Sequence, residues 1–94
     1  MSEITVKCAV YGALAGGNEN RAQASDVTLA LQKAIDSMDG IVKINNDNMG
    51  VDPCPKRSKH FGAVITRCDS TKLYYYACGE GQTVDFKHGG QPPS

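Results

Sequence analysis

The feature that most constrains the fold is a pair of apolar runs rich in β-branched and aromatic residues, joined by a short polar turn. The runs are Phe61–Cys68 and Lys72–Cys78, and the turn lies at Asp69–Lys72. β-Branched and aromatic residues favour strands, and two such runs separated by a few turn-forming residues are typical of a β-hairpin. The sequence therefore predicts an antiparallel pair of strands.

Shorter segments add further strands to this pair. Ile4–Tyr11 alternates apolar and polar residues and then becomes fully apolar, which predicts a strand covered on both faces at its end. Gly12–Gln23 is polar and glycine-rich, so we expect a loop, and it contains no phosphate-binding motif. Ile41–Asn45 and Thr83–Phe86 predict two short strands, and residues 88–94 predict a frayed tail.

One helix is predicted over about residues 26–37, with Ser25 or Asp26 as its N-cap and Asp39-Gly40 at its end. A strand through the same residues also fits the alternation of its apolar positions, but Ala, Leu, Gln and Lys favour a helix. The apolar stripe of that helix is Val27, Leu31, Ala34, Ile35 and Met38. The predicted fold is mainly β, a small antiparallel sheet or sandwich with one short helix, in a single domain spanning residues 1–94 and ordered over about 3–87.

The charge balance argues against two classes of partner. Ten basic and ten acidic residues give a net charge of zero, whereas binding to nucleic acid or to an anionic membrane needs a basic surplus. No apolar run approaches the length of about 18 residues that spans a membrane, and the N-terminus has no apolar signal-peptide region. We therefore predict a cytoplasmic or otherwise intracellular protein without nucleic-acid or membrane partners.

The four cysteines are predicted to be free and mostly buried thiols. Cys8, Cys54, Cys68 and Cys78 lack the close pairs that mark a structural zinc site. The hairpin can pair in either of two registers that differ by one residue in the turn, and neither brings Cys68 and Cys78 within the Cα separation of about 7 Å that a disulfide requires. Free thiols are typical of a reducing compartment.

The segment Asn45–Lys56 lies between two strand-like runs and consists mostly of Asn, Asp, Gly and Pro. These residues tolerate left-handed backbone or restrict φ, so the segment is predicted to be an ordered surface loop, where binding residues usually lie. A small basic patch of Lys56, Arg57 and Lys59 begins at its end, and we expect these three side chains to be solvated, as short charge runs in loops usually are. The candidate binding residues are Asn46, Asp47, Asn48, Asp52, Lys56, His60 and Tyr75.

Several short motifs carry a resemblance to a known family. They are Tyr11-Gly-Ala, Asp26-Val-Thr with Leu31-Gln32, Asp52-Pro-Cys-Pro-Lys56, Lys59 and Glu80-Gly-Gln-Thr83. In this order they resemble the small domain that ends the eleventh member of the DnaJ-like C subfamily, and the free-standing relatives of that domain. The resemblance covers roughly residues 4–86. It implies a β-rich interaction domain and supplies no catalytic residues.

The loop does not match a calcium-binding or catalytic motif. With Gly50 at the sixth position of an EF-hand loop, the fifth would be Met49 and the twelfth Lys56. Asx turns account for the amide and carboxyl groups without an ion, so no metal and no cofactor is predicted. Cys54 and His60 form a conceivable nucleophilic pair, but such a pair also needs an orienting carboxylate. The chain is therefore not predicted to be an enzyme.

Tyr75 completes the candidate site. In a strand, Tyr74 and Tyr76 share one face while Tyr75 lies on the other, so at least one tyrosine is predicted to be exposed. The sequence thus predicts a non-enzymatic module that docks a protein partner, or self-associates as a homo-oligomer, through loop 45–59 and a sheet edge. The alternative is a carbohydrate-binding lectin that uses the amide-rich loop and an exposed tyrosine to bind a glycan. An enzyme based on Cys54 and His60 is a weaker third hypothesis.

Overall fold

The computed structural model describes residues 4–68 and 71–90. Its elements are β1 (Ile4–Leu14), η1 (a 3₁₀ turn, Ala15–Gly17), β2 (Ala22–Asp26), α1 (Thr28–Ser37), β3 (Ile41–Lys43), α2 (Asn46–Met49), β4 (His60–Arg67), β5 (Tyr74–Gly79) and β6 (Thr83–Asp85). Four strands form an antiparallel sheet in the order β2-β1-β4-β5, and β3 pairs with β6 in a second, two-stranded sheet. The prediction of a mainly β fold with one short helix over about 26–37 is confirmed.

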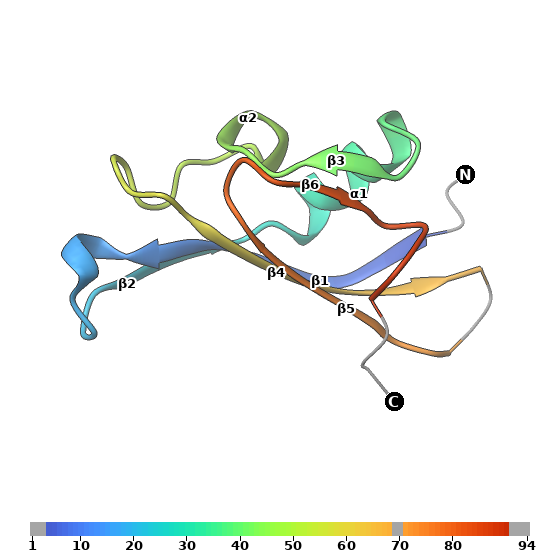
Figure 1. Ribbon diagram of the computed structural model, residues 1–94, viewed down its shortest axis with the longest axis horizontal. Coiled ribbons are helices and arrows are strands. Elements are labelled where there is room, and N and C mark those ends of the chain that lie inside the picture. The colour runs from blue at the N-terminus through green and yellow to red at the C-terminus, as the bar shows by residue number, and fades with distance from the viewer. Residues whose placement is uncertain (1–3, 69–70, 91–94) are drawn as a thin grey trace.

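The molecule has two layers. The helices α1 and α2 and the β3–β6 pair all lie on one face of the four-stranded sheet (Figure 1). The core lies between these layers, and its largest fully buried side chains include Tyr11, Phe86, Leu31, Ile35, Ile44, Met49 and Ile65. No element of the described chain covers the opposite side of the sheet, which we call the outer face (Figure 1).

The predicted central hairpin is confirmed. β4 and β5 pair antiparallel, with Ala63 opposite Tyr76 and Phe61 opposite Cys78. Residues 69–70 of the predicted turn lie outside the described residues. Phe61 and Ala63 are buried on the core side, and Phe61 also makes an edge contact with the ring of Phe86. Alternate positions of the hairpin therefore face the core, as period-two strands require.

The predicted loop over Gly12–Gln23 is too long, because both ends of this segment belong to the sheet and only residues 15–21 connect the two strands. Gly12–Leu14 continue β1, and β2 begins at Ala22. Gly12 lies opposite Ala24, and a Cβ on Gly12 would lie only 2.5 Å from the Cβ of Ala24. The glycine therefore allows two strands to approach closely instead of ending a strand.

The prediction that β1 is covered on both faces at its end is also wrong. Tyr11 is fully buried, but its neighbour Val10 is 55% exposed because the second layer covers only one face of the sheet. A β-bulge between Val6 and Cys8 changes the alternation and leaves Cys8 exposed. The four cysteines are free thiols, but they are not mostly buried, since Cys8 and Cys68 are exposed and only Cys54 is fully buried.

The helix interpretation of residues 26–37 is correct, although α1 begins at Thr28. The predicted N-cap is wrong, because Val27 occupies that position and has no capping side chain; Asp26 precedes it, and its carboxylate accepts a 2.9 Å hydrogen bond from the Thr28 amide. The predicted apolar stripe faces the core except for Met38, which is 40% exposed just past the end of the helix. Asp39 and Gly40 then reverse the chain with φ of 53° and 85°.

Residues 88–90 were predicted to be part of a frayed tail, but they dock on the sheet. The Tyr76 hydroxyl donates a hydrogen bond to the His88 carbonyl at 2.7 Å, and Arg67 Nη2 donates to the Gly89 carbonyl at 2.9 Å. The Tyr75 amide donates to the Gly90 carbonyl at 2.7 Å. The rest of the predicted tail, residues 91–94, lies outside the described residues.

Candidate functional site

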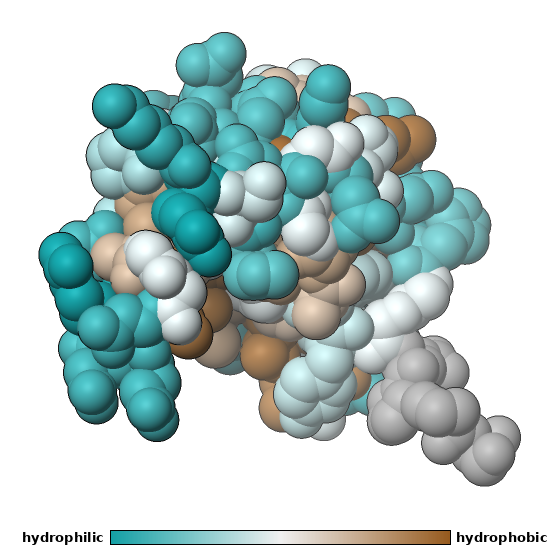
Figure 2. All heavy atoms as spheres, turned by 60° about the vertical axis from the view of Figure 1, so that its left-hand side comes forward, coloured by the Kyte–Doolittle hydropathy of each residue, from teal (hydrophilic) through white to brown (hydrophobic). Residues whose placement is uncertain are grey.

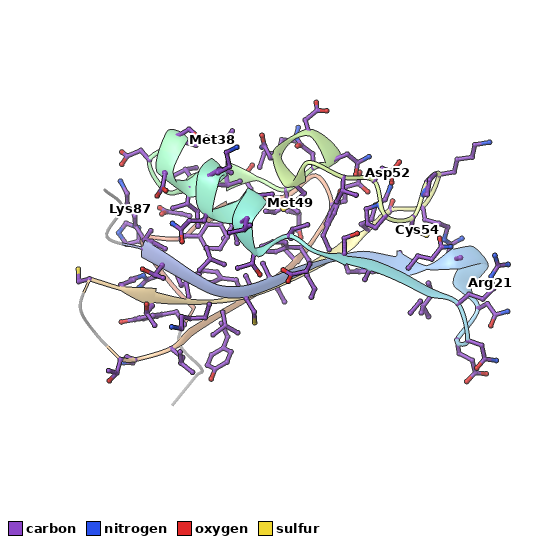
Figure 3. All side chains as sticks on the ribbon, turned by 180° about the vertical axis from the view of Figure 1, so that it is seen from behind. Arg21, Met38, Met49, Asp52, Cys54 and Lys87 are labelled. Carbon is purple, nitrogen blue, oxygen red and sulfur yellow. The ribbon has the colours of Figure 1, made fainter. Side chains whose placement is uncertain are left out.

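Two of the predicted site residues, Asn46 and Asp52, belong to a polar cluster between the loop and the sheet. Its other members are Tyr11 on β1, Lys59 just before β4 and Glu80 just after β5. The Tyr11 hydroxyl donates to Asn46 Oδ1 at 2.7 Å, and Lys59 Nζ lies 2.6 Å from Asp52 Oδ1. Figure 3 shows Asp52 on the loop above the sheet. The cluster thus ties loop 45–59 to the sheet.

Lys59 is the central cation of this polar cluster. Only 3% of the residue is exposed, although the sequence placed it in a solvated basic patch. Besides Asp52, its ammonium group lies 3.9 Å from Glu80 Oε1. Its backbone amide donates to the same carboxylate at 2.9 Å, and its carbonyl accepts from the Glu80 amide at 2.8 Å. Lys59 therefore joins the loop, the start of β4 and the end of β5.

The cluster favours the protonated form of Tyr11. Burial raises the pKa of Tyr11 to about 12, and the negative charges of Glu80 and Asp52 act in the same direction. The phenol therefore remains a hydrogen-bond donor throughout the neutral pH range. It is a structural contact and does not serve as a base.

This raised pKa predicts a loss of stability in alkali. The folded state holds the Tyr11 proton more tightly than the unfolded state, so the stabilisation is complete below pH 10 and is lost between about pH 10 and 12. At about 1.4 kcal/mol per pKa unit, we expect the free energy of unfolding to fall by roughly 3 kcal/mol over this interval. Urea unfolding at a series of pH values measures it. A Tyr11→Phe variant that loses as much stability in alkali as the wild type would contradict the assignment.

The side-chain amides of the loop form hydrogen bonds within the loop and to the residues beside it. The Asn45 side chain accepts the Asn48 amide at 2.8 Å and caps α2, as expected for an N-cap. The Asn48 side chain donates to the Lys43 carbonyl at 2.7 Å. Asp47 is exposed and lies with Asn48 at a surface groove of about 300 Å³ between α2 and α1. Most of the predicted amide site is therefore local structure.

The remaining predicted residues do not gather into one site. Cys54 is 1% exposed, while His60 is exposed at the start of β4, and no hydrogen bond joins these two side chains. Lys56 is exposed with a φ of 66°. Tyr75 is 54% exposed, as predicted, but it lies on the outer face, whereas the loop packs on the other face. The structure thus separates the tyrosine from the amide-rich loop.

The edges of the four-stranded sheet are a further place where a partner could bind, and two of them are occupied at least in part. Along the first half of β1, α1 supplies side-chain partners to the backbone. Thr28 Oγ1 accepts from the Ala9 amide at 3.0 Å. Gln32 accepts from the Val6 amide at 2.8 Å and donates to the Ile4 carbonyl at 2.9 Å. These bonds close this part of the edge to another strand.

The β5 edge is occupied at both of its ends. Its outward amides at Tyr75 and Gly79 donate to the Gly90 carbonyl and to the Gln82 side chain, each at 2.7 Å. A short C-terminal segment and a turn thus take the donors at the two ends of this edge, while no described residue bonds to the outward amide of Ala77 between them. Covering an edge in this way is a common means of preventing unwanted strand pairing.

The β2 edge differs from the other two. The bonds from the Val27 amide to the Ala9 carbonyl and from the Ala15 amide to the Arg21 carbonyl show that odd-numbered residues of this segment bond to β1. The N–H and C=O groups of Ala22 and Ala24 therefore point away from the sheet. No described residue bonds to them. We call these four backbone groups the open edge.

The open edge has little of the usual protection. The segment Ala22-Gln-Ala-Ser25 contains no Pro, Lys or other charged residue, and its bulge-free ladder leaves three of these four residues exposed, although β2 is short and ends in the charged Asp26. β2 was not recognised in the sequence because its residues show neither apolar alternation nor β-branched side chains. The available signal was the glycine at position 12, which permits the pairing with Ala24.

Comparison with known proteins assigns no function to these features. No protein-family model matches the chain, and neither a curated protein nor a solved structure is significantly similar to it. The resemblance to the DnaJ-like C domain therefore stays a prediction. No helix within residues 4–68 and 71–90 has the length and apolar character needed to cross a membrane. The same residues hold no group of three or more His, Cys, Asp or Glu side chains placed to bind a metal ion.

Proposed function

We propose that this protein is an interaction module that binds an extended segment of a partner protein as an additional strand on β2. The observation that carries the proposal is the open edge at Ala22 and Ala24, in a sheet whose other described edges are occupied at least in part. Strand addition is a general mode of peptide recognition in which the backbone supplies affinity and alternate side chains supply specificity.

The geometry of the open edge suits such an addition. Two N–H donors and two C=O acceptors, spaced by two residues, match the repeat of an extended chain. Each hydrogen bond contributes about 0.5–1.5 kcal/mol net, so four of them alone would give only weak binding. Side-chain contacts must therefore supply the rest of the affinity. Ala24 and Val10, which lie diagonally across the β1–β2 pair, offer a small apolar surface on the outer face for one side chain of the partner, and the charged Asp26 lies opposite Val10.

Loop 45–59 takes a supporting part in this proposal. Tyr11 lies opposite Ser25 in the β1–β2 pair, and its hydroxyl bonds to Asn46 of the loop. The loop thus braces β1 directly behind β2, which keeps the open edge rigid. The lectin alternative has less support, because the loop amides make internal hydrogen bonds and Tyr75 lies on the other side of the sheet.

An Ala24→Pro variant tests the proposal. Proline removes the outward N–H without breaking the ladder to β1, and edge strands tolerate proline at such a position. Peptides selected on the wild-type protein from a displayed library of random linear peptides are expected to bind Ala24→Pro at least about tenfold more weakly, equivalent to about 1.4 kcal/mol. Isothermal titration measures this loss.

The matched control is Ala24→Ser, which keeps the amide donor and a small exposed side chain. It is expected to bind the same peptides within about twofold of wild type, a difference below about 0.5 kcal/mol. Thermal unfolding checks that both variants fold. Selected peptides that bind Ala24→Pro as tightly as wild type would show that they bind elsewhere, and the proposal would then be rejected.

A further inference from the structure

The open edge lies between groups of opposite charge. Arg21 immediately precedes Ala22, and Asp26 is the last residue of β2. Both charged residues are exposed. At a rise of about 3.3 Å per residue they are about 17 Å apart along the strand. An extended segment bound on β2 therefore has a cation beside one of its ends and an anion beside the other.

The positive end of the edge has more than one cation. The tip of loop 45–59 reaches out over the connection between β1 and β2 (Figure 1). Arg57 of this tip lies against the connection, since its Nη2 atom is 3.5 Å from the position that a Cβ on Gly17 would take. The preceding residue, Lys56, is exposed, as are Arg57 and Arg21. The three cations lie at one end of the sheet, where their fields add.

These cations have no anionic partner among the residues that the structure describes. No carboxylate there forms an ion pair with Arg21, Arg57 or Lys56. Glu19 is the one acidic residue of the β1–β2 connection, so it offsets only one of the three positive charges. Figure 2 brings this end of the molecule forward, and hydrophilic side chains (teal) gather on it. The positive charge is therefore available to a partner.

The negative end of the edge stays charged at neutral pH. The Asp26 carboxylate accepts hydrogen bonds from the amide and the hydroxyl of Thr28, at 2.9 and 2.5 Å, and these bonds lower the pKa of Asp26. Both bonds reach Oδ1, so Oδ2 remains for a cation of the partner. A charge on an edge strand usually discourages pairing. Here it restricts pairing to strands that carry a cation at this position.

The sheet favours one direction for an added strand. All pairs within it are antiparallel, and antiparallel pairing is slightly more stable per residue than parallel pairing. Since β2 runs from Ala22 to Asp26, an antiparallel partner has its C-terminal end beside Arg21 and its N-terminal end beside Asp26. Directly opposite side chains on neighbouring strands lie on the same face, and opposite charges there attract.

We propose that the segment bound at the open edge runs antiparallel to β2 and is bipolar, with Lys or Arg opposite Asp26 and Asp or Glu opposite Arg21. The acidic side chain accepts paired N–H bonds from the Arg21 guanidinium, a geometry that suits carboxylates. Arg57 and Lys56 add to the attraction. The inference rests on the proposed strand addition and names the chemistry of the partner.

Peptide selection tests the charge pattern directly. A displayed library of random linear peptides is selected on the wild-type protein. Sequences in which an acid follows a base by five positions are expected at least about three times as often as in the unselected library. Selection on a double variant, Arg21→Glu with Arg57→Glu, is expected to lose this preference for the acid. Sequencing of the selected pools measures both frequencies.

Isothermal titration of one selected peptide measures the size of the effect. The peptide is expected to bind the double variant at least about tenfold more weakly than the wild type. The same peptide with its acid replaced by Lys is expected to bind the double variant at least about threefold more tightly than the wild type.

The matched control is Lys33→Glu with Lys43→Glu. It changes the net charge by the same amount, at exposed positions on α1 and β3. This control is expected to bind the original peptide within about twofold of wild type. Circular dichroism checks the fold of both double variants.

Three results would overturn the inference. The first is a selected pool without the spaced base and acid, and the second is a pool in which the acid precedes the base. The third is a peptide that the Arg21→Glu, Arg57→Glu protein binds no more weakly than the control does. A peptide weakened by Ala24→Pro but not by Arg21→Glu with Arg57→Glu would keep strand addition and reject the bipolar partner. A peptide that Ala24→Pro leaves unaffected would reject both.

Discussion

A Gly12→Ala variant is expected to lose about 3 kcal/mol of unfolding free energy, the upper part of the range for overpacked sites. The added Cβ would lie 2.5 Å from the Cβ of Ala24 and closer still to Ala24 Cα and the Gln23 carbonyl oxygen. Two of these three atoms belong to the backbone, so no side-chain rotation can relieve the contact. β1 and β2 must therefore move apart, and urea denaturation measures the cost.

The matched control is Gly62→Ala, another glycine-to-alanine change in the same sheet. A Cβ there would meet Tyr76 O at 3.8 Å and a Val10 methyl group at 3.9 Å, which are ordinary contacts. Alanine also loses less conformational freedom on folding than glycine, so this variant is expected to be neutral or more stable by up to about 1 kcal/mol. Equal stability of the Gly12→Ala and Gly62→Ala variants would contradict the close approach.

The Gly12→Ala variant also bears on function. Because Gly12 lies opposite Ala24, separation of these strands displaces the open edge. Peptides that depend on the Ala24 amide are therefore expected to bind this variant weakly even where it remains folded. Peptide affinities that do not change would place the binding surface away from β2.

The parts of the fold predicted from the sequence are those in which local preference and tertiary contacts agree. The hairpin Phe61–Cys78 combines β-branched and aromatic residues with a short turn, and both its strands form. The helix over 26–37 has good helix formers and an acceptor at Asp26. Elements in which local and tertiary preferences agree can be predicted from the sequence.

The missed parts depend on contacts between residues far apart in the chain. β2 has weak strand preference, and its pairing with β1 depends on the space that Gly12 leaves. The docking of residues 88–90 depends on Arg67 and Tyr76, which lie many positions earlier. Neither arrangement has a local sequence pattern, so propensity alone could not predict it.

Only part of the candidate site was predicted, because its other members also come from distant parts of the chain. Asn46 and Asp52 do lie together, because the turn-forming loop holds both near the sheet. Their partners Tyr11, Lys59 and Glu80 come from β1, the start of β4 and the end of β5, and Lys59 in a basic run was expected to be solvated. Its burial follows from two carboxylates that converge on it only in the folded chain.

Lys59→Met is the second variant for which we expect a large loss, about 3 kcal/mol of unfolding free energy. Removing one partner of a buried ion pair typically costs about 3–5 kcal/mol, because the remaining charge is left without compensation. The lower end of this range applies here because 39% of the Asp52 side chain is exposed to water, which partly compensates its charge. Methionine keeps the length and apolar stem of lysine, so the loss reflects the missing ammonium group.

Lys87→Met is the matched control for this variant. The Lys87 ammonium lies 2.9 Å from Asp39, but both side chains are substantially exposed. Exposed ion pairs contribute about 0–1 kcal/mol, so the same substitution there is expected to cost less than about 1 kcal/mol. Chemical unfolding of both variants under identical conditions gives the difference directly.

A double variant separates charge from packing. If the cost of Lys59→Met comes from carboxylates left without a cation, adding Asp52→Asn removes one of them and is expected to recover about 1 kcal/mol, since replacing both partners costs less than removing one. If packing of the lysine stem dominates, the second change adds to the loss. A Lys59→Met variant no less stable than Lys87→Met would show that the polar cluster does not hold loop 45–59 on the sheet.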